Sequence, residues 1–319
     1  MGTWIFTHGD TDGICSAAIA FAANPDAHIF FTHPYGLAED LDTAGDDDNV
    51  IICDIALSEN HLVRVLQRFT SIAEKGKLTY IDHHPLPETV SKDLMPGRMV
   101  HSLDSSTSEL AYSLFQSALE PFQARLAIFG AIGDNQDNTI LIQQLLKRWD
   151  KRTLYFESGV LIQGIEGQKR NYELKRRIVS NLAHNMPPSA DNQLIELAVQ
   201  QTRLEESAIR KLVTHVQVMG RIAYTFNFPF SLGKTAIYAA GLTDATVGVA
   251  CEEWKDMVDV SLRTFSMEVD LNRLLRLIAP KLGGSGGGHK MAAGARIPKE
   301  KIKAFLNELN KHLTQDIKK

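Results

Sequence analysis

Acids and histidines follow several short apolar runs of this chain, and their side chains are of the types that bind divalent metal ions. In chain order they are His8, Asp10, Asp12, Asp54, Asp82, His83, His84 and Asp134. Carboxylates and imidazoles gathered at one place can hold two ions roughly 3.5–4 Å apart, which stabilise the attacking and departing oxygens of a phosphoester displacement. The residue types therefore predict metal-dependent phosphoester hydrolysis.

The spacing of these residues suggests how two ions could be shared. Asp10 and Asp12 stand two apart just after a predicted strand, and on an extended segment such residues face the same side. Asp54 could then bridge the ions, while His83 and Asp134 complete the second site. The predicted metal ligands are His8, Asp10, Asp12, Asp54, His83 and Asp134.

Two neighbouring residues are expected to support this site. Asp82 is predicted to orient a ligand histidine rather than to bind metal itself, and His84 to point toward the substrate phosphate. Mixed imidazole and carboxylate ligands favour manganese, cobalt or iron over magnesium, which prefers oxygen ligands alone. We therefore predict two divalent ions, with Mn²⁺ favoured and Co²⁺ or Mg²⁺ as alternatives.

Far along the chain, a second group of residues has the chemistry of phosphate binding. The predicted substrate-binding residues are Ser261, Arg263, Gly286, Gly287, Gly288 and His289. A strand arginine beside a serine can bind a phosphate through two hydrogen bonds. Glycines let the backbone approach a ligand and present amides to an anion, and the histidine could add a hydrogen bond or stack on a base.

Each of these features also has a simpler interpretation. A lone aspartate after a strand is usually a helix N-cap, and paired histidines in loops are often only solvated. A strand arginine can form a structural ion pair, and a glycine-rich run is more often a linker. The joint pattern, in order and at strand ends, favours the metal site.

The elements that must position these residues alternate along the first part of the chain. Predicted strands cover residues 4–7, 27–32, 50–54 and 78–82, with helices such as residues 13–23 and 58–69 between them. Such alternation predicts a parallel, doubly wound sheet, in which ligands bind beyond the carboxyl ends of the strands. Asp10, Asp54 and Asp82 fall at those ends.

The chain of 319 residues is long enough for two α/β domains. We predict a catalytic domain over residues 1–186, a helical connector over 187–218 after the break at Pro187-Pro188, and a smaller C-terminal α/β domain over 219–319. Within the last, helices are expected at residues 271–282 and 298–313, with a glycine-rich loop at 283–289 between them.

The overall composition narrows the class of protein. A net charge of −4 is not that of a protein that coats nucleic acid. Three scattered cysteines indicate a reducing, cytoplasmic environment, and we expect neither a signal peptide nor a membrane span. One locally basic helical region could be a solvated face or a track for a nucleic-acid backbone. It contains Lys147, Arg148, Lys151, Arg152, Lys169, Arg170, Lys175, Arg176 and Arg177.

Taken together, the motifs resemble those of the DHH/DHHA1 phosphoesterase superfamily, in particular its archaeal RecJ-like nuclease and nano-RNase/pAp phosphatase group. The catalytic-domain motifs match Asp10-Thr-Asp-Gly, Cys-Asp54, Asp82-His83-His84 and Gly-Asp134, and Ser105-Ser-Thr-Ser-Glu109 resembles the segment before the fourth motif. The second-domain motifs match Val260-Ser-Leu-Arg263 and Gly286-Gly-Gly-His289-Lys-Met-Ala-Ala-Gly294. His8 stands two residues before Asp10, as in the archaeal group. Bacterial oligoribonuclease relatives instead carry a histidine four residues before this aspartate, at the position that Phe6 occupies here.

The resemblance implies manganese-dependent hydrolysis of phosphodiesters or phosphomonoesters, with the substrate between the two domains. We expect an exonuclease that acts from an end on single-stranded nucleic acid or short oligonucleotides. A phosphatase or phosphodiesterase for pAp, nano-RNA or cyclic dinucleotides is the alternative. A noncatalytic scaffold for replication or repair proteins is a third interpretation, which the full set of ligand-type residues disfavours. The oligomeric state stays open.

Overall fold

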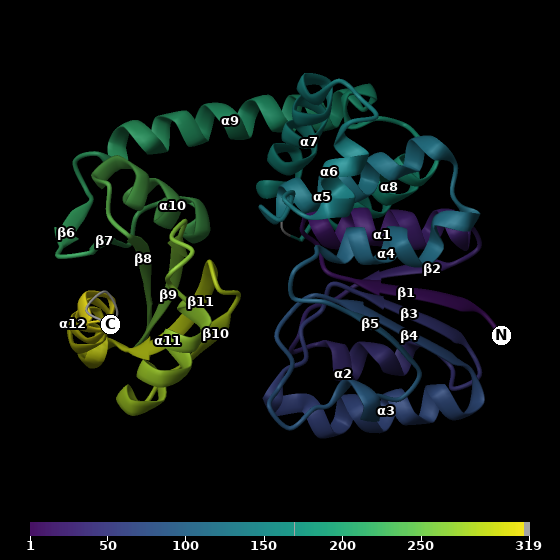
Figure 1. Ribbon diagram of the computed structural model, residues 1–319, viewed down its shortest axis with the longest axis horizontal. Helices are drawn as coiled ribbons and strands as arrows, with labels where there is room; N and C mark the ends of the chain where they lie inside the picture. The colour runs from purple at the N-terminus through teal and green to yellow at the C-terminus, as the bar shows by residue number, and fades with distance from the viewer. Residues whose placement is uncertain (169, 316–319) are drawn as a thin grey trace. The chain divides into compact units, whose positions relative to one another are not determined.

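The computed structural model describes residues 1–168 and 170–315 (Figure 1). The chain divides into two compact units, Met1–Thr202 and Arg203–Lys319. Thr202 lies in the helix α9 (Asn192–Leu212), which falls within the predicted connector. The predicted domain limits of 1–186, 187–218 and 219–319 remain a proposal. Among the described residues, no helix combines the length and apolar character needed to cross a membrane.

The first unit is built on a five-stranded sheet in which every pair of neighbouring strands is parallel. Its strands, in the order β2-β1-β3-β4-β5, are β1 (Thr3–Thr7), β2 (His28–Phe31), β3 (Asn49–Cys53), β4 (Lys77–Asp82) and β5 (Arg98–His101). The predicted doubly wound parallel sheet is confirmed. Strand β5 was not predicted from the sequence.

Helices cover both faces of this sheet, as Figure 1 shows. The helices before α9 are α1 (Thr11–Ala23), α2 (Leu37–Asp40), α3 (Leu62–Lys75), α4 (Thr107–Phe115), α5 (Ala124–Gly133), α6 (Ile140–Leu146), α7 (Lys151–Glu166) and α8 (Tyr172–Ala183). Of these, α5 and α8 pack on α1, and α6 and α7 pack on α5. Alternate strand residues face opposite sides, so Ile5 joins the core with α1, whereas Phe6 joins the core with α3. The two apolar cores fix the sheet and thereby the positions of its strand ends.

The second unit contains a six-stranded mixed sheet in the order β10-β11-β9-β8-β7-β6. The strands are β6 (Gln217–Met219), β7 (Ile222–Phe226), β8 (Val247–Trp254), β9 (Met257–Thr264), β10 (Ser285–Gly288) and β11 (Ala292–Pro298). Only β7 and β8 pair in parallel, because a helix, α10 (Leu232–Thr243), connects them. The helices α11 (Leu271–Ile278) and α12 (Ile302–Gln315) supply apolar residues to the core of this unit.

Three sequence-based expectations for this unit were wrong in detail. The predicted glycine-rich loop contains the strand β10, since Gly286 and Gly287 pair with Ala295 and Gly294 of β11. The helix predicted from residue 271 ends at Ile278, just before Pro280. The last helix begins at Ile302 rather than at Pro298, which ends β11.

Candidate metal centre

The carboxyl ends of β1, β3 and β4 lie side by side, because these strands are neighbours in the sheet. Asp10 follows β1, Asp54 follows β3 and Asp82 ends β4. The backbone of Asp54 continues the ladder, since its amide donates to the carbonyl of Ile81 at 3.0 Å. The register of the sheet therefore brings three predicted site residues to one edge.

Asp54 has an unusual backbone conformation and a buried carboxylate. Its φ of 60° lies in the left-handed region, which aspartate occupies rarely and at some cost in free energy. Asp54 is 2% exposed, and its Oδ1 accepts a hydrogen bond from Thr107 Oγ1 at 3.1 Å. Within residues 1–168 and 170–315, Oδ2 has no hydrogen-bond partner although it is buried. A buried carboxylate oxygen without a donor fits a cation better than a purely structural role.

The six predicted metal ligands form two groups that share Asp54. In the first, ligand atoms of Asp12, Asp54, His83 and Asp134 all lie within 4.8 Å of one another. In the second, the same limit holds for His8, Asp10 and Asp54. The mixed nitrogen and oxygen donors of both groups are of the types that bind divalent transition-metal ions, and Asp54 could serve either group.

His83 lies between two acids of the first group. Its Nε2 is 3.1 Å from Asp134 Oδ2 and 3.4 Å from Asp54 Oδ1. Burial lowers the pKa of His83, but hydrogen bonding to Asp134 and Asp54 and their charges outweigh this and raise it. The imidazole must lose its proton to bind a metal through Nε2, so metal binding at this group is coupled to proton release.

Asp12 is placed differently from the sequence-based expectation. It lies in the first turn of α1 rather than on an extended segment, because Asp10 is the N-cap of that helix and accepts from the Gly13 amide at 3.0 Å. The Asp12 carboxylate is completely buried and accepts hydrogen bonds from the amides of Thr107 at 2.6 Å and Ser108 at 2.9 Å. Burial, with a contribution from Asp134, raises the pKa of Asp12 to about 7.

The first turn of α4 therefore donates hydrogen bonds to two of the predicted ligands, Asp12 and Asp54. This contact was not expected from the sequence. Ser106 caps α4 and accepts from the Glu109 amide at 3.2 Å. The run from Ser106 to Glu109 has the capping-box spacing, which could have predicted the start of the helix. Nothing in the spacing indicates that the helix begins against Asp12.

Gly130 of α5 is a second residue of the site that was not predicted from the sequence. A Cβ at this position would lie 2.5 Å from Asp12 Oδ1, and it would also overlap the side chain of Ser108. Only glycine lets α5 pass this close to the buried carboxylate. The absence of a side chain at Gly130 is therefore part of the site.

The second group is more accessible than the first. His8 Nδ1 lies 2.7 Å from Asp10 Oδ2, and the two side chains are 40% and 46% exposed. Partial burial raises the pKa of Asp10, but the charge of His8 and its hydrogen bond outweigh this and lower it. The Asp10 charge in turn raises the pKa of His8.

Asp82 orients a histidine, but it contacts His84 rather than the predicted ligand His83. Asp82 Oδ1 lies 2.8 Å from His84 Nδ1, and Oδ2 accepts from the His84 amide at 3.2 Å. The Tyr80 hydroxyl lies 2.9 Å from the same Oδ2. Asp82 is completely buried, so these contacts fix the imidazole of His84 in one orientation beside Asp54.

The predicted substrate-binding residues gather on one part of the second sheet. In the strand register, Ser261 of β9 is opposite Gly294 of β11, which is opposite Gly287 of β10. Arg263 donates from Nη1 to Ser261 Oγ at 3.1 Å. The amide of Gly288 donates to Asn272 Oδ1 at 3.1 Å, and anion binding by the glycine amides of this run stays a prediction.

Two family models match the chain where these two sets of residues lie. The model described as "DHH family, N-terminal domain" matches residues 3–134, and "DHHA1 domain" matches residues 228–315. The chain belongs to the DHH/DHHA1 phosphoesterase superfamily. Members of the superfamily are metal-dependent phosphoesterases, and the class of enzyme predicted from the sequence is confirmed. No curated sequence matches the chain at a significant level.

Several solved structures share the DHH/DHHA1 fold with this chain. A DHH-domain protein described as a member of the S1p family of ribosomal proteins has a TM-score of 0.74 at 18% identity, covering 98% of this chain and 87% of its own. RecJ from Thermus thermophilus in complex with Mn²⁺ has a TM-score of 0.67 at 17% identity. That match covers 98% of this chain and 52% of RecJ, so the chain spans about half of the RecJ length.

A third structure is of a different enzyme. The pGpG-specific phosphodiesterase PggH from Vibrio cholerae has a TM-score of 0.62 at 14% identity, and the match covers 99% of this chain and 100% of PggH. At such low identities the likeness shows a common fold and leaves the substrate open.

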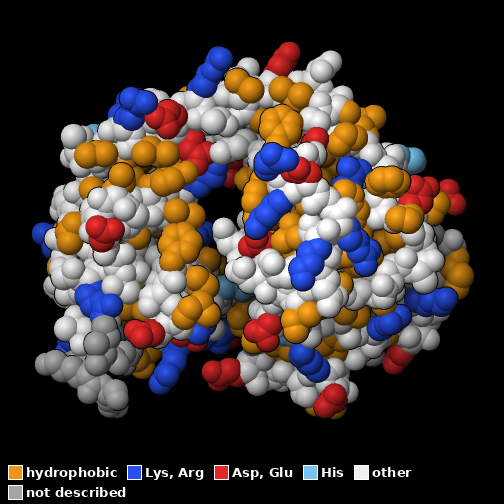
Figure 2. Space-filling view, turned by 45° about the horizontal axis from the view of Figure 1, so that its top comes forward, with side chains coloured by type: hydrophobic (Ala, Val, Ile, Leu, Met, Phe, Trp, Pro, Cys, Tyr) orange, Lys and Arg blue, Asp and Glu red, His pale blue; other side chains and the backbone are white. Residues whose placement is uncertain are grey.

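Lys175 of the predicted basic track is buried, whereas Lys147, Arg148, Lys151 and Arg170 of the same track are exposed. Lys175 is 3% exposed, and its Nζ would lie 2.7 Å from a Cβ placed on Gly9, between the predicted ligands His8 and Asp10. Arg152, Arg176 and Arg177 form ion pairs with neighbouring acids, and Lys169 lies outside the described residues. Lys and Arg side chains are interspersed with apolar and acidic ones in Figure 2. Lys175 is better described as a neighbour of the metal centre than as part of a track.

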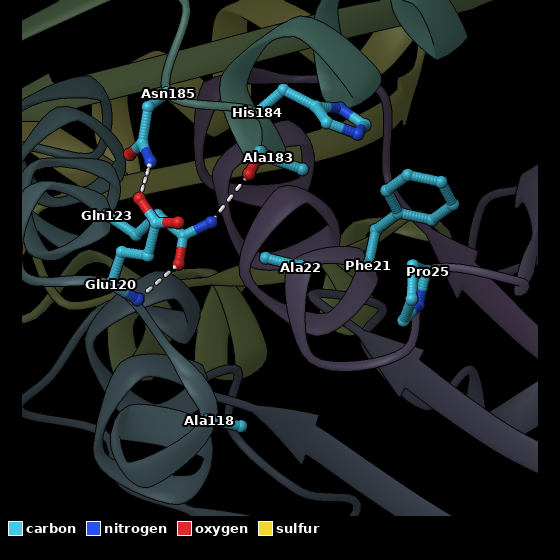
Figure 3. A pocket seen from close by; sticks show the side chains of 9 residues that line it. All are labelled: Phe21, Ala22, Pro25, Ala118, Glu120, Gln123, Ala183, His184 and Asn185. Carbon is cyan, nitrogen blue, oxygen red and sulfur yellow. Dashed lines mark hydrogen bonds between the residues drawn. The ribbon is translucent and has the colours of Figure 1, made fainter.

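A pocket of about 330 Å³ lies at the C-terminal end of α1, away from the acids at its N-terminal end (Figure 3). It is lined by Phe21, Ala22, Pro25, Ala118, Glu120, Gln123, Ala183, His184 and Asn185. Several of its polar groups bond to one another, such as Asn185 Nδ2 to Glu120 Oε2 at 2.6 Å. The pocket contains none of the predicted site residues.

Proposed function

We propose that this protein hydrolyses phosphodiester bonds of short oligonucleotides or single-stranded nucleic acid from an end, using two divalent metal ions. The observation that carries this proposal is the position of Asp54. Its carboxylate belongs to both groups of ligand atoms, and its buried Oδ2 accepts no hydrogen bond from the described residues. A single carboxylate within reach of two ligand groups suits two ions held roughly 3.5–4 Å apart, the spacing of two-metal phosphoester hydrolysis.

The two ions, when bound, would supply positive charge for the phosphoryl oxygens and lower the pKa of water. Asp12, Asp54, His83 and Asp134 are proposed to hold one ion, and His8, Asp10 and Asp54 the other. Manganese is the favoured ion because imidazole and carboxylate donors are mixed. The Thermus RecJ, which shares the fold, is described in complex with Mn²⁺ and, in another structure, with Mg²⁺.

His84 is proposed to contact a phosphoryl oxygen of the substrate. Asp82 Oδ1 lies 2.8 Å from His84 Nδ1 and thereby fixes the ring. The other ring nitrogen, Nε2, is therefore the one proposed to contact the substrate. The side chain is 26% exposed, which leaves room for such a contact. A carboxylate on one nitrogen of a histidine strengthens hydrogen bonding or proton transfer at the other.

The DHHA1 unit is proposed to bind a second phosphate or the end of the substrate. Arg263 is held by Ser261, so its guanidinium is oriented before a ligand arrives. A guanidinium that is already oriented loses less side-chain entropy on binding, and its charge and paired N–H donors suit a phosphate. His289 follows the glycine-rich strand β10, whose close pairing with β11 fixes its position.

We propose short substrates over long ones because part of the predicted basic track is engaged within the protein. Arg152, Arg176 and Arg177 are paired with neighbouring acids and Lys175 is buried, whereas Lys147, Arg148, Lys151 and Arg170 are exposed. A long single strand gains affinity mainly from cations available to its backbone. A phosphodiesterase or phosphatase for small nucleotides is therefore the second candidate, and the complete coverage of the PggH fold is consistent with it.

End-labelled RNA and DNA of graded length, incubated with Mn²⁺ or with a chelator, would test this proposal. We expect stepwise loss of end nucleotides with Mn²⁺ and none with the chelator, with the shortest substrates cleaved fastest. Cleavage of dinucleotides or pAp alone would favour the second candidate. If Mn²⁺-loaded protein hydrolyses none of these substrates, the proposal is wrong and a scaffold role becomes the better interpretation.

A further inference from the structure

The pocket of the DHH-containing unit lies where two helices end. Phe21 and Ala22 belong to the last turn of α1, Ala183 is the last residue of α8, and Glu120 lies between α4 and α5. The pocket has a volume of about 330 Å³, which is at the lower end of the range of small-molecule sites. A ligand bound there would be recognised by side chains separate from those of the metal centre.

The charges around this pocket favour a cation. The C-terminal end of a helix carries a partial negative charge, and two such ends meet here. Both last turns lie within the described residues, and neither contains a basic side chain. Of the nine described residues that line the pocket, Glu120 is the one with a full charge when His184 is neutral. Arg125, the basic residue nearest to Glu120 in the sequence, donates from Nε to the carbonyl of Phe122 at 3.1 Å, outside the lining.

The polar groups of the lining leave acceptors for a ligand. Gln123 Nε2 donates to the last carbonyl of α8 at 2.5 Å, and Asn185 Nδ2 donates to Glu120 Oε2 at 2.6 Å. His184 Nδ1 lies 2.8 Å from a carbonyl of α8, so this nitrogen carries a hydrogen and Nε2 of the neutral ring is an acceptor. The amide nitrogens already donate within the protein, so a ligand that supplies its own N–H donors fits the lining best.

The shape of the pocket separates its polar residues from its apolar ones. Figure 3 shows Glu120 and Asn185 on one side and Phe21 and Pro25 on the other. Asn185 has a φ of 61°, in the left-handed conformation that commonly ends a helix, and its bond to Glu120 orients the carboxylate before a ligand arrives. The arrangement suits a molecule with a charged head and an apolar body.

We propose that this pocket binds a small organic cation, with an ammonium group beside Glu120 and a short apolar body against Phe21 and Pro25. The inference goes beyond the proposed function and does not depend on it. A metal ion fits less well, because Mg²⁺ and Ca²⁺ bind through several oxygens and the described lining offers a single carboxylate. An anionic ligand would be repelled by Glu120 and by both helix ends.

Titration of the ¹⁵N-labelled full chain with pentylammonium tests the pocket, with the side-chain amide signals of Gln123 and Asn185 followed by NMR. Pentanol and pentanoate are neutral and negative probes of the same chain length. We expect pentylammonium to saturate the shifts at roughly fivefold lower concentration than pentanol, the gain that an exposed ion pair allows. Pentanoate should bind most weakly. Ala118→Leu should fill the pocket and prevent binding of all three probes.

Glu120→Gln separates the charge of the site from its shape. The glutamine keeps an oxygen that can accept from Asn185 Nδ2 but loses the negative charge, so its affinities for pentylammonium and pentanol should become equal. Glu74→Gln is the matched control, because Glu74 is also exposed but lies on α3, which packs on the opposite face of the sheet from α1. This control should keep the wild-type preference.

Four results would overturn the inference. They are equal affinity of wild-type protein for pentylammonium and pentanol, an unchanged preference in Glu120→Gln, unaltered binding in Ala118→Leu, and saturation of the same signals by Mg²⁺ at the concentration that pentylammonium needs. Absence of any saturable shift would also contradict it. None of these results bears on phosphoester hydrolysis, which the cleavage assays with Mn²⁺ test separately.

Discussion

Thr107 donates a hydrogen bond from its hydroxyl to Asp54 Oδ1 across 3.1 Å, and both residues are buried. Thr107 is the first residue of α4, and its amide also donates to Asp12. Thr107 therefore orients two carboxylates. One is that of Asp54, which belongs to both ligand groups, and the other is that of Asp12, which belongs to the first group only. The geometry of the metal centre thus depends on a helix that contributes none of the six ligand-type residues.

Replacement of Thr107 by valine should weaken metal binding without unfolding the protein. The substitution keeps the shape of the side chain but removes the hydroxyl that fixes Asp54. Loss of a partner that orients a metal ligand commonly reduces affinity by about 10–100-fold, and Thr107→Ser should restore it. Titration with Mn²⁺ measures the change.

A control for this experiment is available in the second unit. Thr235 is also buried, and its hydroxyl has no hydrogen-bond partner within the described part of the chain. Thr235→Val should therefore leave Mn²⁺ affinity unchanged. Equal Mn²⁺ affinity in wild type and Thr107→Val would show that Thr107 does not position Asp54.

Alanine at Gly130 should disturb both stability and metal binding. Its Cβ would be 2.5 Å from Asp12 Oδ1, with Ser108 also too close, and overpacking of this kind costs about 1–3 kcal/mol of unfolding free energy. Gly159 of α7 is a matched helical control, since a Cβ there meets nothing within 4 Å. Gly159→Ala should stabilise the protein by about 0.4–1 kcal/mol.

Urea unfolding with and without Mn²⁺ measures both glycine variants. Gly130→Ala should have a smaller unfolding free energy than wild type, and added Mn²⁺ should increase that free energy less than it does in wild type. Identical behaviour of the two alanine variants would mean that α5 can move away from Asp12 at little cost.

The metal-free protein should lose part of its stability as pH rises. Burial and the charge of Asp134 raise the pKa of Asp12 from 3.8 to about 7, so the folded state holds a proton that the unfolded state releases. The resulting stabilisation is complete below about pH 3.8 and is lost as pH rises through about 7. Asp12→Asn cannot titrate, so the unfolding free energy of chelator-treated wild type should fall relative to this variant across that range.

Bound metal should reverse this trend, because Asp12 must lose its proton to act as a ligand. The stabilisation of wild type by Mn²⁺ should therefore grow as pH rises, and Asp12→Asn should lack most of it. Urea unfolding at several pH values gives both quantities. A difference between wild type and Asp12→Asn that is constant with pH would contradict the raised pKa of Asp12.

The positions of Asp10, Asp54 and Asp82 could be predicted because each one follows or ends an apolar run. Asp54 follows a run of buried β-branched residues in β3, and a parallel sheet must bring such ends together. The conformation of Asp12 could not be predicted in the same way. Asp10 serves both as helix cap and as candidate ligand, so α1 begins one residue before Asp12. An aspartate after a strand can therefore be a helix N-cap and a candidate metal ligand at the same time.

Other parts of the site depend on contacts between distant segments. Thr107 and Gly130 have no sequence feature that relates them to Asp12, because only the packing of α4 and α5 on α1 brings them there. Strand β10 contains one serine and three glycines, so its strand propensity is low and its pairing with β11 determines its structure. The fixed φ of Pro298 suits the first turn of a helix, yet Pro298 ends β11 because this strand pairs with β9 up to Met257.

Metal stoichiometry measured together with turnover in Asp54→Asn tests the central claim most directly. Asparagine tolerates the positive φ of this position, so the backbone should be preserved while the shared negative charge is lost. We expect wild type to bind two Mn²⁺ per chain and to hydrolyse short oligonucleotides. The variant should lose at least one ion and all measurable hydrolysis while remaining folded. Two bound ions and near wild-type turnover in Asp54→Asn would contradict the account.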